Sequence, residues 1–86
     1  MNVATTLIDR GTALAAVDRC MFVGFDGVPL VHCWTGREHA DWTVEAVEHL
    51  IGRSDRCGWI EHPFTARECL AVEADGQVFV FDRVES

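Results

Sequence analysis

The chain has 86 residues, of which 49% are hydrophobic, and its 14 acidic and seven basic side chains give a formal net charge of -7. This length suits one domain, residues 1–86, and leaves little room for both a core and a deep catalytic pocket, so we expect no enzymatic activity. The acidic balance excludes direct nucleic acid binding, because like charges repel, and favours a basic partner.

The ends and apolar runs of the chain predict its location. The N-terminal stretch MNVATTLIDRG has no basic segment followed by an apolar run, so we expect no signal peptide. Every apolar run is far shorter than the ~20 residues of a membrane span, so we expect no membrane partner. The sequence therefore predicts a cytoplasmic protein whose four cysteines stay mostly reduced.

The first segment has two interpretations. One is a helix over roughly residues 4–19, with Gly11 unfavourably placed in its middle. Its apolar side would consist of Leu7, Leu14, Val17 and Met21. The other is a short strand over residues 3–8 followed by a brief helix.

The stretch CMFVGFDGVPLVHCW, residues 20–34, predicts a β-hairpin. Asp-Gly between two apolar runs indicates a type I′ turn, which requires positive φ at both central positions. With Asp26 and Gly27 as a two-residue loop, Gly24 faces Pro29 at a non-hydrogen-bonded position. Proline is tolerated there because its missing N–H would donate to no neighbour on that strand.

The same register brings two cysteines together. It pairs Phe25 with Val28 and places Cys20 opposite Cys33. Such a pair could form a cross-strand disulfide under oxidation. We favour two buried thiols that pack as small hydrophobic groups, because the protein is expected in the cytosol.

Residues 36–51 are predicted to form a second helix that ends at Gly52. Its core side consists of Ala40, Val44, Val47 and Ile51. Three starts are compatible with the sequence, namely a capping box of Thr35 and Glu38, or a shorter helix capped by Asp41 or by Thr43.

The C-terminal third predicts three strands. Residues 57–64, CGWIEHPF, form a short strand ended by Pro63, and residues 68–84 form a second Asp-Gly hairpin. Glu68 would face Arg83 at its rim. The expected register pairs Ala74 with Gln77, Val72 with Phe79 and Leu70 with Phe81.

These elements together predict an α+β fold. We expect a small single domain in which two Asp-Gly hairpins and a short strand form an antiparallel sheet. Two helices pack on this sheet, and the order of the elements is α-ββ-α-β-ββ.

Four cysteines and four histidines raise the question of a zinc site. Zinc sites usually contain close ligand pairs such as C-x2-C, which this chain lacks. Cys57, His62 and Cys69 are the best candidate ligands, and Cys33 with His39 is a looser pair. Their irregular spacing favours buried structural cysteines, so we expect neither a metal nor another cofactor.

The stretch REHADWTVEAVEHL, residues 37–50, suggests a binding surface. On a helix over residues 38–51, an exposed tryptophan would lie among carboxylates on the side opposite the core, and tryptophan is enriched at binding hot spots. The predicted partner-binding residues are Glu38, Asp41, Trp42, Glu45, Glu48 and His49. If the helix instead begins at Thr43, Trp42 could pack against Val47 and the acids would be an ordinary solvated face.

We therefore expect a non-enzymatic acidic inhibitor that blocks the basic surface of a nucleic-acid-handling protein or complex. In size and charge only, the protein is similar to small anti-restriction and anti-CRISPR proteins of phages and mobile elements. Like them, it would act by nucleic-acid mimicry. The alternatives are an immunity or antitoxin-type protein, a small zinc-binding module, and a structural homodimer joined through an exposed strand edge.

Overall fold

The computed structural model describes residues 6–36, 39–62 and 66–82, and it has the predicted α+β fold. The predicted helices, hairpins and strand follow one another in the expected order, and two further short strands, β1 and β4, accompany them. The elements are β1 (Thr6–Ile8), α1 (Arg10–Cys20), β2 (Met21–Val23), β3 (Pro29–His32), β4 (Asp41–Thr43), α2 (Val44–Gly52), β5 (Arg56–Glu61), β6 (Glu68–Ala74) and β7 (Gln77–Phe81).

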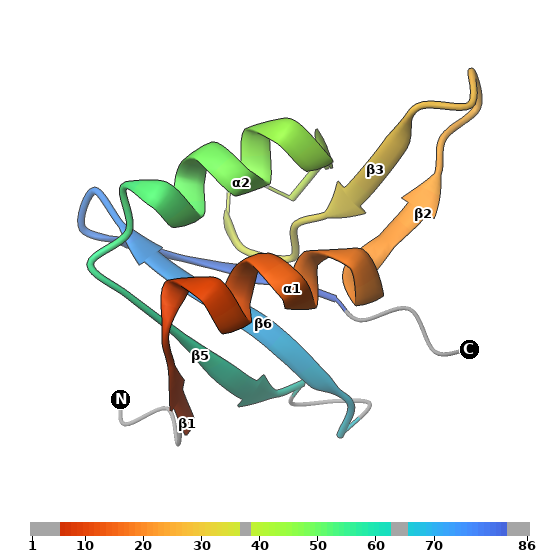
Figure 1. The fold of residues 1–86 in the computed structure, drawn as a ribbon. Coiled ribbons are helices and arrows are strands. Elements are labelled where there is room, and N and C mark those ends of the chain that lie inside the picture. Colours follow the sequence, from red (N-terminus) through yellow and green to blue (C-terminus); the bar gives the residue numbers. More distant parts are fainter. Residues whose placement is uncertain (1–5, 37–38, 63–65, 83–86) are drawn as a thin grey trace.

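The strands form two antiparallel sheets, each containing one of the predicted hairpins. The larger sheet has the order β1-β5-β6-β7 and the smaller one the order β2-β3-β4. The two helices pack against each other, and both contact β6, so they cover the same face of the larger sheet (Figure 1). A bridge between Cys33 and Phe81 joins the two sheets. The β2–β3 hairpin extends away from this body (Figure 1).

The second hairpin has the predicted register. Asp75 and Gly76 have φ values of 55° and 75°, as a type I′ turn requires. Glu68 begins strand β6, but its expected partner Arg83 lies outside the described residues. The pairs are Ala74 with Gln77, Val72 with Phe79 and Leu70 with Phe81, and all of these except Gln77 are buried. Alternating apolar residues with one buried face therefore predicted this hairpin correctly.

The first segment is a short strand followed by a helix, so the second interpretation is confirmed and the single helix over residues 4–19 is wrong. Asp9 is the N-cap of α1, and its Oδ1 accepts a 2.6 Å hydrogen bond from the Thr12 amide, which lowers the pKa of Asp9. This later start moves Gly11 into the first turn and rotates the apolar side. The buried residues of α1 are Ala13, Ala16, Val17 and Cys20, whereas Leu7, Leu14 and Met21 are exposed.

The second helix also begins later than its longest predicted form. It starts at Val44, and the Oγ1 of Thr43 accepts a 3.2 Å hydrogen bond from the Ala46 amide. The cap at Thr43 is thereby confirmed, and the helix over residues 36–51 is wrong. Ala40 lies exposed before the helix, and the buried residues of α2 are Val47, Leu50 and Ile51.

The residues before α2 form strand β4 because β3 offers them a sheet edge. Leu30 pairs with Thr43, Val31 with Trp42 and His32 with Asp41. This pairing places Trp42 beside the fully buried Val31 and removes part of the indole from water. A helical Trp42 on the solvent side would lose that burial.

The first hairpin is present, but its predicted register is wrong by one residue. Val23 pairs with Pro29, and the Gly24 amide donates to the Val28 carbonyl over 2.8 Å. The loop therefore has three residues, of which Gly27 has a φ of 83°. Pro29 still lies at a non-hydrogen-bonded position towards β2, because the hydrogen-bonded pair is the next one along.

The register shift also separates the two cysteines that were expected to face each other. Cys20 is the last residue of α1, and Cys33 pairs instead with Phe81 of strand β7. All four cysteines of the chain are buried thiols. They contribute to the core as small hydrophobic groups.

Candidate functional site

The predicted binding face is divided between a strand and a helix, so the continuous helical stripe of acids is wrong. Glu38 lies outside the described residues. The structure places Asp41 and Trp42 on β4, and Glu45, Glu48 and His49 on α2. These two elements remain adjacent because β4 leads directly into α2.

Trp42 is half-buried against the core, so its predicted exposure on the solvent side of a helix is wrong. Its ring packs edge-to-face on Phe79 and Phe81, with centroid distances of 5.4 and 5.7 Å. It is half-buried against the core cluster that includes Val47. The residue that precedes the helix cap turns inward, as in a hydrophobic staple.

The carboxylates of β4 and α2 remain exposed. Glu45 is 85% exposed, and its Oε1 lies 3.9 Å from the Nε2 of His49, too exposed a pair to contribute much stability. Glu48 is also exposed, one turn along the same side. Asp41 accepts a 2.7 Å hydrogen bond from the Nδ1 of His32. The described partners of these acids are therefore histidines.

The arginines pair with acids in other parts of the molecule. Residues 21–52 hold five acids and only one arginine. This arginine, Arg37, lies outside the described residues. This stretch thus contributes four of the seven net negative charges. The arginine pairs of the described chain are Arg53 with Asp75, Arg56 with Glu73 and Arg67 with Asp82. We call residues 21–52, which include β2, β3, β4 and α2, the acidic side.

Register separates Cys57 from the other two zinc candidates. Cys57 pairs with Val72 and Cys69 pairs with Ile60, three positions further along β5, so the two thiols project from opposite faces of the sheet. His62 follows the far end of β5, about 16 Å along the strand from Cys57. Among the residues the structure describes, no group of three or more His, Cys, Asp or Glu side chains could hold a metal ion.

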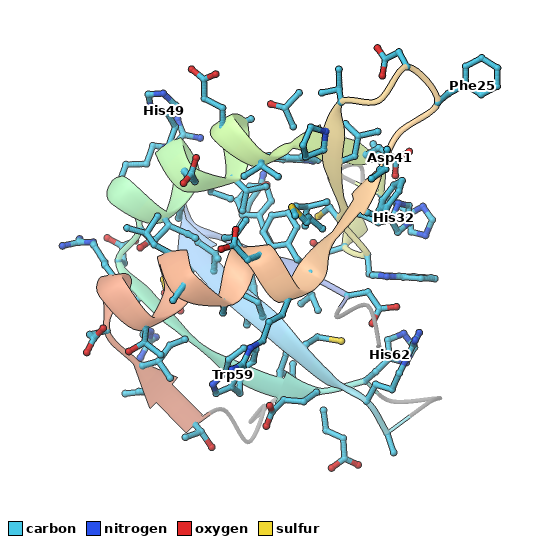
Figure 2. All side chains as sticks on the ribbon, turned by 45° about the vertical axis from the view of Figure 1, so that its right-hand side comes forward. Phe25, His32, Asp41, His49, Trp59 and His62 are labelled. Atoms are coloured by element: carbon cyan, nitrogen blue, oxygen red, sulfur yellow. The ribbon has the colours of Figure 1, made fainter. Side chains whose placement is uncertain are left out.

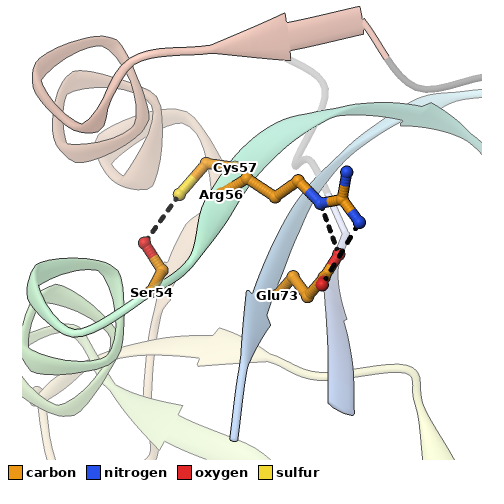
Figure 3. A network of polar contacts seen from close by, with 4 residues as sticks. All are labelled: Ser54, Arg56, Cys57 and Glu73. Atoms are coloured by element: carbon orange, nitrogen blue, oxygen red, sulfur yellow. Dashed lines mark hydrogen bonds and ion pairs between the residues drawn. The ribbon is translucent and has the colours of Figure 1, made fainter. Parts of the chain in front are cut away.

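The surroundings of Cys57 are structural. Its Sγ lies 3.3 Å from the Oγ of Ser54, which is buried and donates to the Ile51 carbonyl at the end of α2 (Figure 3). On the opposite face of the strand, Arg56 binds Glu73 with both Nε and Nη2, over 2.7 and 3.3 Å. The hydrogen bond and charge of Glu73 raise the pKa of Arg56. These contacts stabilise the turn from α2 into β5.

A cluster of histidine and tryptophan rings consists of His32 of β3, Trp34 just after β3, His39 before β4 and His62 after β5. Trp34 lies 4.9 Å from His32, 5.1 Å from His39 and 5.5 Å from His62, measured between ring centroids. All three contacts are edge-to-face. The cluster was not predicted as a site, although the alternation of His32 and Trp34 around buried Cys33 indicates two rings on one side of an extended segment.

This ring cluster is best explained as packing between segments. Asp41 orients the His32 ring through Nδ1, an arrangement that general bases also use. The other contacts of His32 are the rings of Trp34 and His39, at 4.9 and 4.8 Å. The same extended segment is hydrogen-bonded to β7, because the Trp34 amide donates to the Val80 carbonyl over 2.7 Å. The cluster thus joins the smaller sheet to the larger one.

The tip of the β2–β3 hairpin is the most exposed apolar part of the acidic side. Phe25 is fully exposed, at 110%, and Val23 is 74% exposed. Figure 2 shows the Phe25 ring at the end of the hairpin, remote from the other labelled residues. The sequence predicted the hairpin but assigned Phe25 to a strand pair, so its exposure was missed.

Within the part of the chain that the structure describes, no helix is long and apolar enough to cross a membrane. Comparisons of the chain with models of protein families, with curated proteins and with solved structures found no significant match.

Proposed function

We propose that this protein is a non-enzymatic inhibitor that binds the basic surface of a nucleic-acid-handling protein. The observation that supports this proposal is the concentration of exposed carboxylates on the acidic side. Asp41, Glu45 and Glu48 lie on adjoining elements, and residues 21–52 contain five acids against one arginine. Such a surface attracts and orients a positively charged partner.

The inhibition would be competitive. Glu45 and Glu48 are one helical turn apart, so their side chains lie about 5–6 Å from each other. Phosphates of one DNA strand advance by about 3.4 Å along the axis, a spacing of the same order. The carboxylates would therefore bind the arginine and lysine side chains of the partner that otherwise bind phosphates. Anti-restriction and anti-CRISPR proteins of phages inhibit by nucleic-acid mimicry of this kind.

The four buried thiols support a cytoplasmic location, where cysteines stay reduced. An immunity or antitoxin-type protein would use the same kind of surface against a basic toxin. The identity of the captured partner separates these two versions of the proposal.

A charge-reversal experiment tests the proposed surface. The protein is immobilised and used to isolate its partner from a bacterial lysate, and the purified partner is then titrated with nucleic acid and competing protein. We expect the wild type to displace nucleic acid, and the double variant Glu45→Arg, Glu48→Arg to lose at least about tenfold in affinity, which is ~1.4 kcal/mol. This loss follows from replacing attraction by repulsion.

The matched control is the double variant Asp55→Arg, Glu61→Arg. It makes the same change of net charge at exposed residues outside the acidic side. We expect its affinity to remain within about threefold of the wild type, because distant exposed charges are screened by salt. If both double variants bind equally well, or if the partner has no nucleic acid to displace, the proposal is wrong.

A further inference from the structure

Exposed apolar side chains are concentrated in the first hairpin. Eight large hydrophobic residues are exposed in the described part of the chain, and four of them fall within residues 21–28. These four are Met21, Val23, Phe25 and Val28. Single exposed apolar residues are normal on protein surfaces, but several of them close together in one projecting element indicate an interaction site.

The hairpin tip is held in one conformation. The Gly24 carbonyl accepts a 3.0 Å hydrogen bond from the Gly27 amide, and the Oδ1 of Asp26 accepts a 3.2 Å hydrogen bond from the Val28 amide. A Cβ atom on Gly24 would lie 2.9 Å from the Val28 carbonyl oxygen, so only glycine allows this close approach. A tip that is already ordered loses little conformational entropy when it binds.

We propose that the tip of this hairpin, with Phe25 as its anchor, inserts into an apolar pocket of a partner protein that is rimmed by arginine or lysine. This inference rests on the proposed function, and it supplies a fully exposed aromatic anchor, whereas Trp42 is half-buried. Phe25 provides the apolar area, and the exposed Asp26 beside it faces the basic rim. Buried aromatic anchors with a polar rim dominate the energetics of many interfaces.

The negative charge of the acidic side decides which kind of surface binds the hairpin tip. A second copy of the chain would bring two acidic sides together, since residues 21–52 contribute four net negative charges. An anionic membrane surface would repel the same residues. A protein pocket with a basic rim is the occupant that satisfies both the apolar tip and its charged surroundings.

A photo-crosslinking experiment tests where the tip lies in the complex. The full chain is produced in bacteria with a benzophenone amino acid in place of Phe25, and a second form carries it in place of Leu7. Leu7 is the matched control because it is 65% exposed on strand β1, outside the acidic side. We expect crosslinks from position 25 to a peptide that lines an apolar pocket beside arginine or lysine, and few from position 7.

Several crosslinking results would overturn the inference. These are crosslinks from position 25 to a second copy of the chain, to lipid, or to a surface without a pocket. Equal crosslinking from both positions, or none from position 25, would also overturn it.

Affinity measurements separate this inference from the proposed function. We expect Phe25→Ala to weaken binding to the captured partner by at least about tenfold and Leu7→Ala to change it by less than about twofold. The loss at Phe25 should be similar at low and high salt, whereas the loss from Glu45→Arg, Glu48→Arg should shrink as salt rises. Circular dichroism of each variant should match the wild type.

The outcomes are distinguishable. If Phe25→Ala binds like the wild type while the charge-reversal variant is weakened, the hairpin inference is wrong and the proposed function stands. If the charge-reversal variant binds like the wild type, the proposed function fails, and with it the basic rim assigned to the pocket.

Discussion

Two hairpins of this protein are built on the same dipeptide, and they differ in nearly every other respect. Asp75-Gly76 is a two-residue turn with positive φ at both positions, whereas Asp26-Gly27 belongs to a three-residue loop in which only Gly27 has positive φ. The second hairpin lies under the two helices, and the first projects from the body (Figure 1).

Packing, rather than the turn residues, therefore decides the register of each hairpin. Strands β6 and β7 bury one complete face, so a slip of one residue would expose the buried phenylalanines. Strand β2 buries no residue completely, so the burial of its own side chains does not select its register. The first hairpin could therefore adopt the three-residue loop that is compatible with the end of α1 on one side and with the bridge from Cys33 to Phe81 on the other.

The largest expected effect comes from comparing one phenylalanine of each hairpin. Phe81→Ala should lower the free energy of unfolding by about 3–5 kcal/mol, because its fully buried ring leaves a cavity. Phe25→Ala should change it by less than about 0.5 kcal/mol, because its ring contacts mainly water. Urea denaturation followed by circular dichroism measures both. Equal losses would mean that the first hairpin packs as tightly as the second.

A second comparison uses two glycines. Gly24→Ala should destabilise the protein by about 1–3 kcal/mol, because its Cβ would lie 2.6 Å from Leu30 Cδ1 and close to a backbone oxygen. Gly52→Ala is the control, since nothing lies within 4 Å and alanine favours the helix by up to about 1 kcal/mol. The midpoint of thermal unfolding should therefore fall for Gly24→Ala and rise for Gly52→Ala. A neutral Gly24→Ala would show that the tip is not held in this conformation.

The two turn aspartates allow a finer test. Asp26→Gly should weaken the first turn by about 1 kcal/mol, because it removes the acceptor of the Val28 amide and adds freedom to the unfolded chain. Asp75→Gly should change stability by at most about 0.5 kcal/mol, since glycine adopts positive φ readily and the exposed pair with Arg53 contributes little. Hydrogen exchange of the turn amides measures each effect. If Asp75→Gly speeds the exchange of its turn amides and Asp26→Gly does not, the predicted order of the two effects is wrong.

The smallest effect concerns acid and the helix that leads into the first hairpin. The pKa of Asp9 is lowered in the folded protein, so its cap stabilises α1 above the unfolded value of about 3.9 and is lost as pH falls through the folded value. Asp9→Asn keeps a capping side chain but does not titrate there. Its unfolding midpoint should fall less steeply below pH 4 than that of the wild type. Identical pH profiles would contradict this assignment.

The predicted placement of the candidate site residues was wrong where a segment could form either a helix or a strand. Glu45, Glu48 and His49 are exposed on a helix as expected, because a polar side of that helix exists for either start. Asp41 and Trp42 moved to a strand because β3 offered an edge, which helical periodicity cannot reveal. The ring cluster around Trp34 depends on His39 and His62, which only the folded chain brings together.

The sequence by itself determined the α+β class, the order of its predicted elements, the register of the second hairpin and the excess of acid in residues 21–52. These follow from local patterns, since alternation with one buried face and the count of charges need no distant partner. The tertiary structure alone decided the start of α2, the register of the first hairpin and the burial of Trp42. Each of these depends on which apolar surface or strand edge a distant element offers for packing. The free energy gained by burying side chains on that surface outweighs the local conformational preference of the residues.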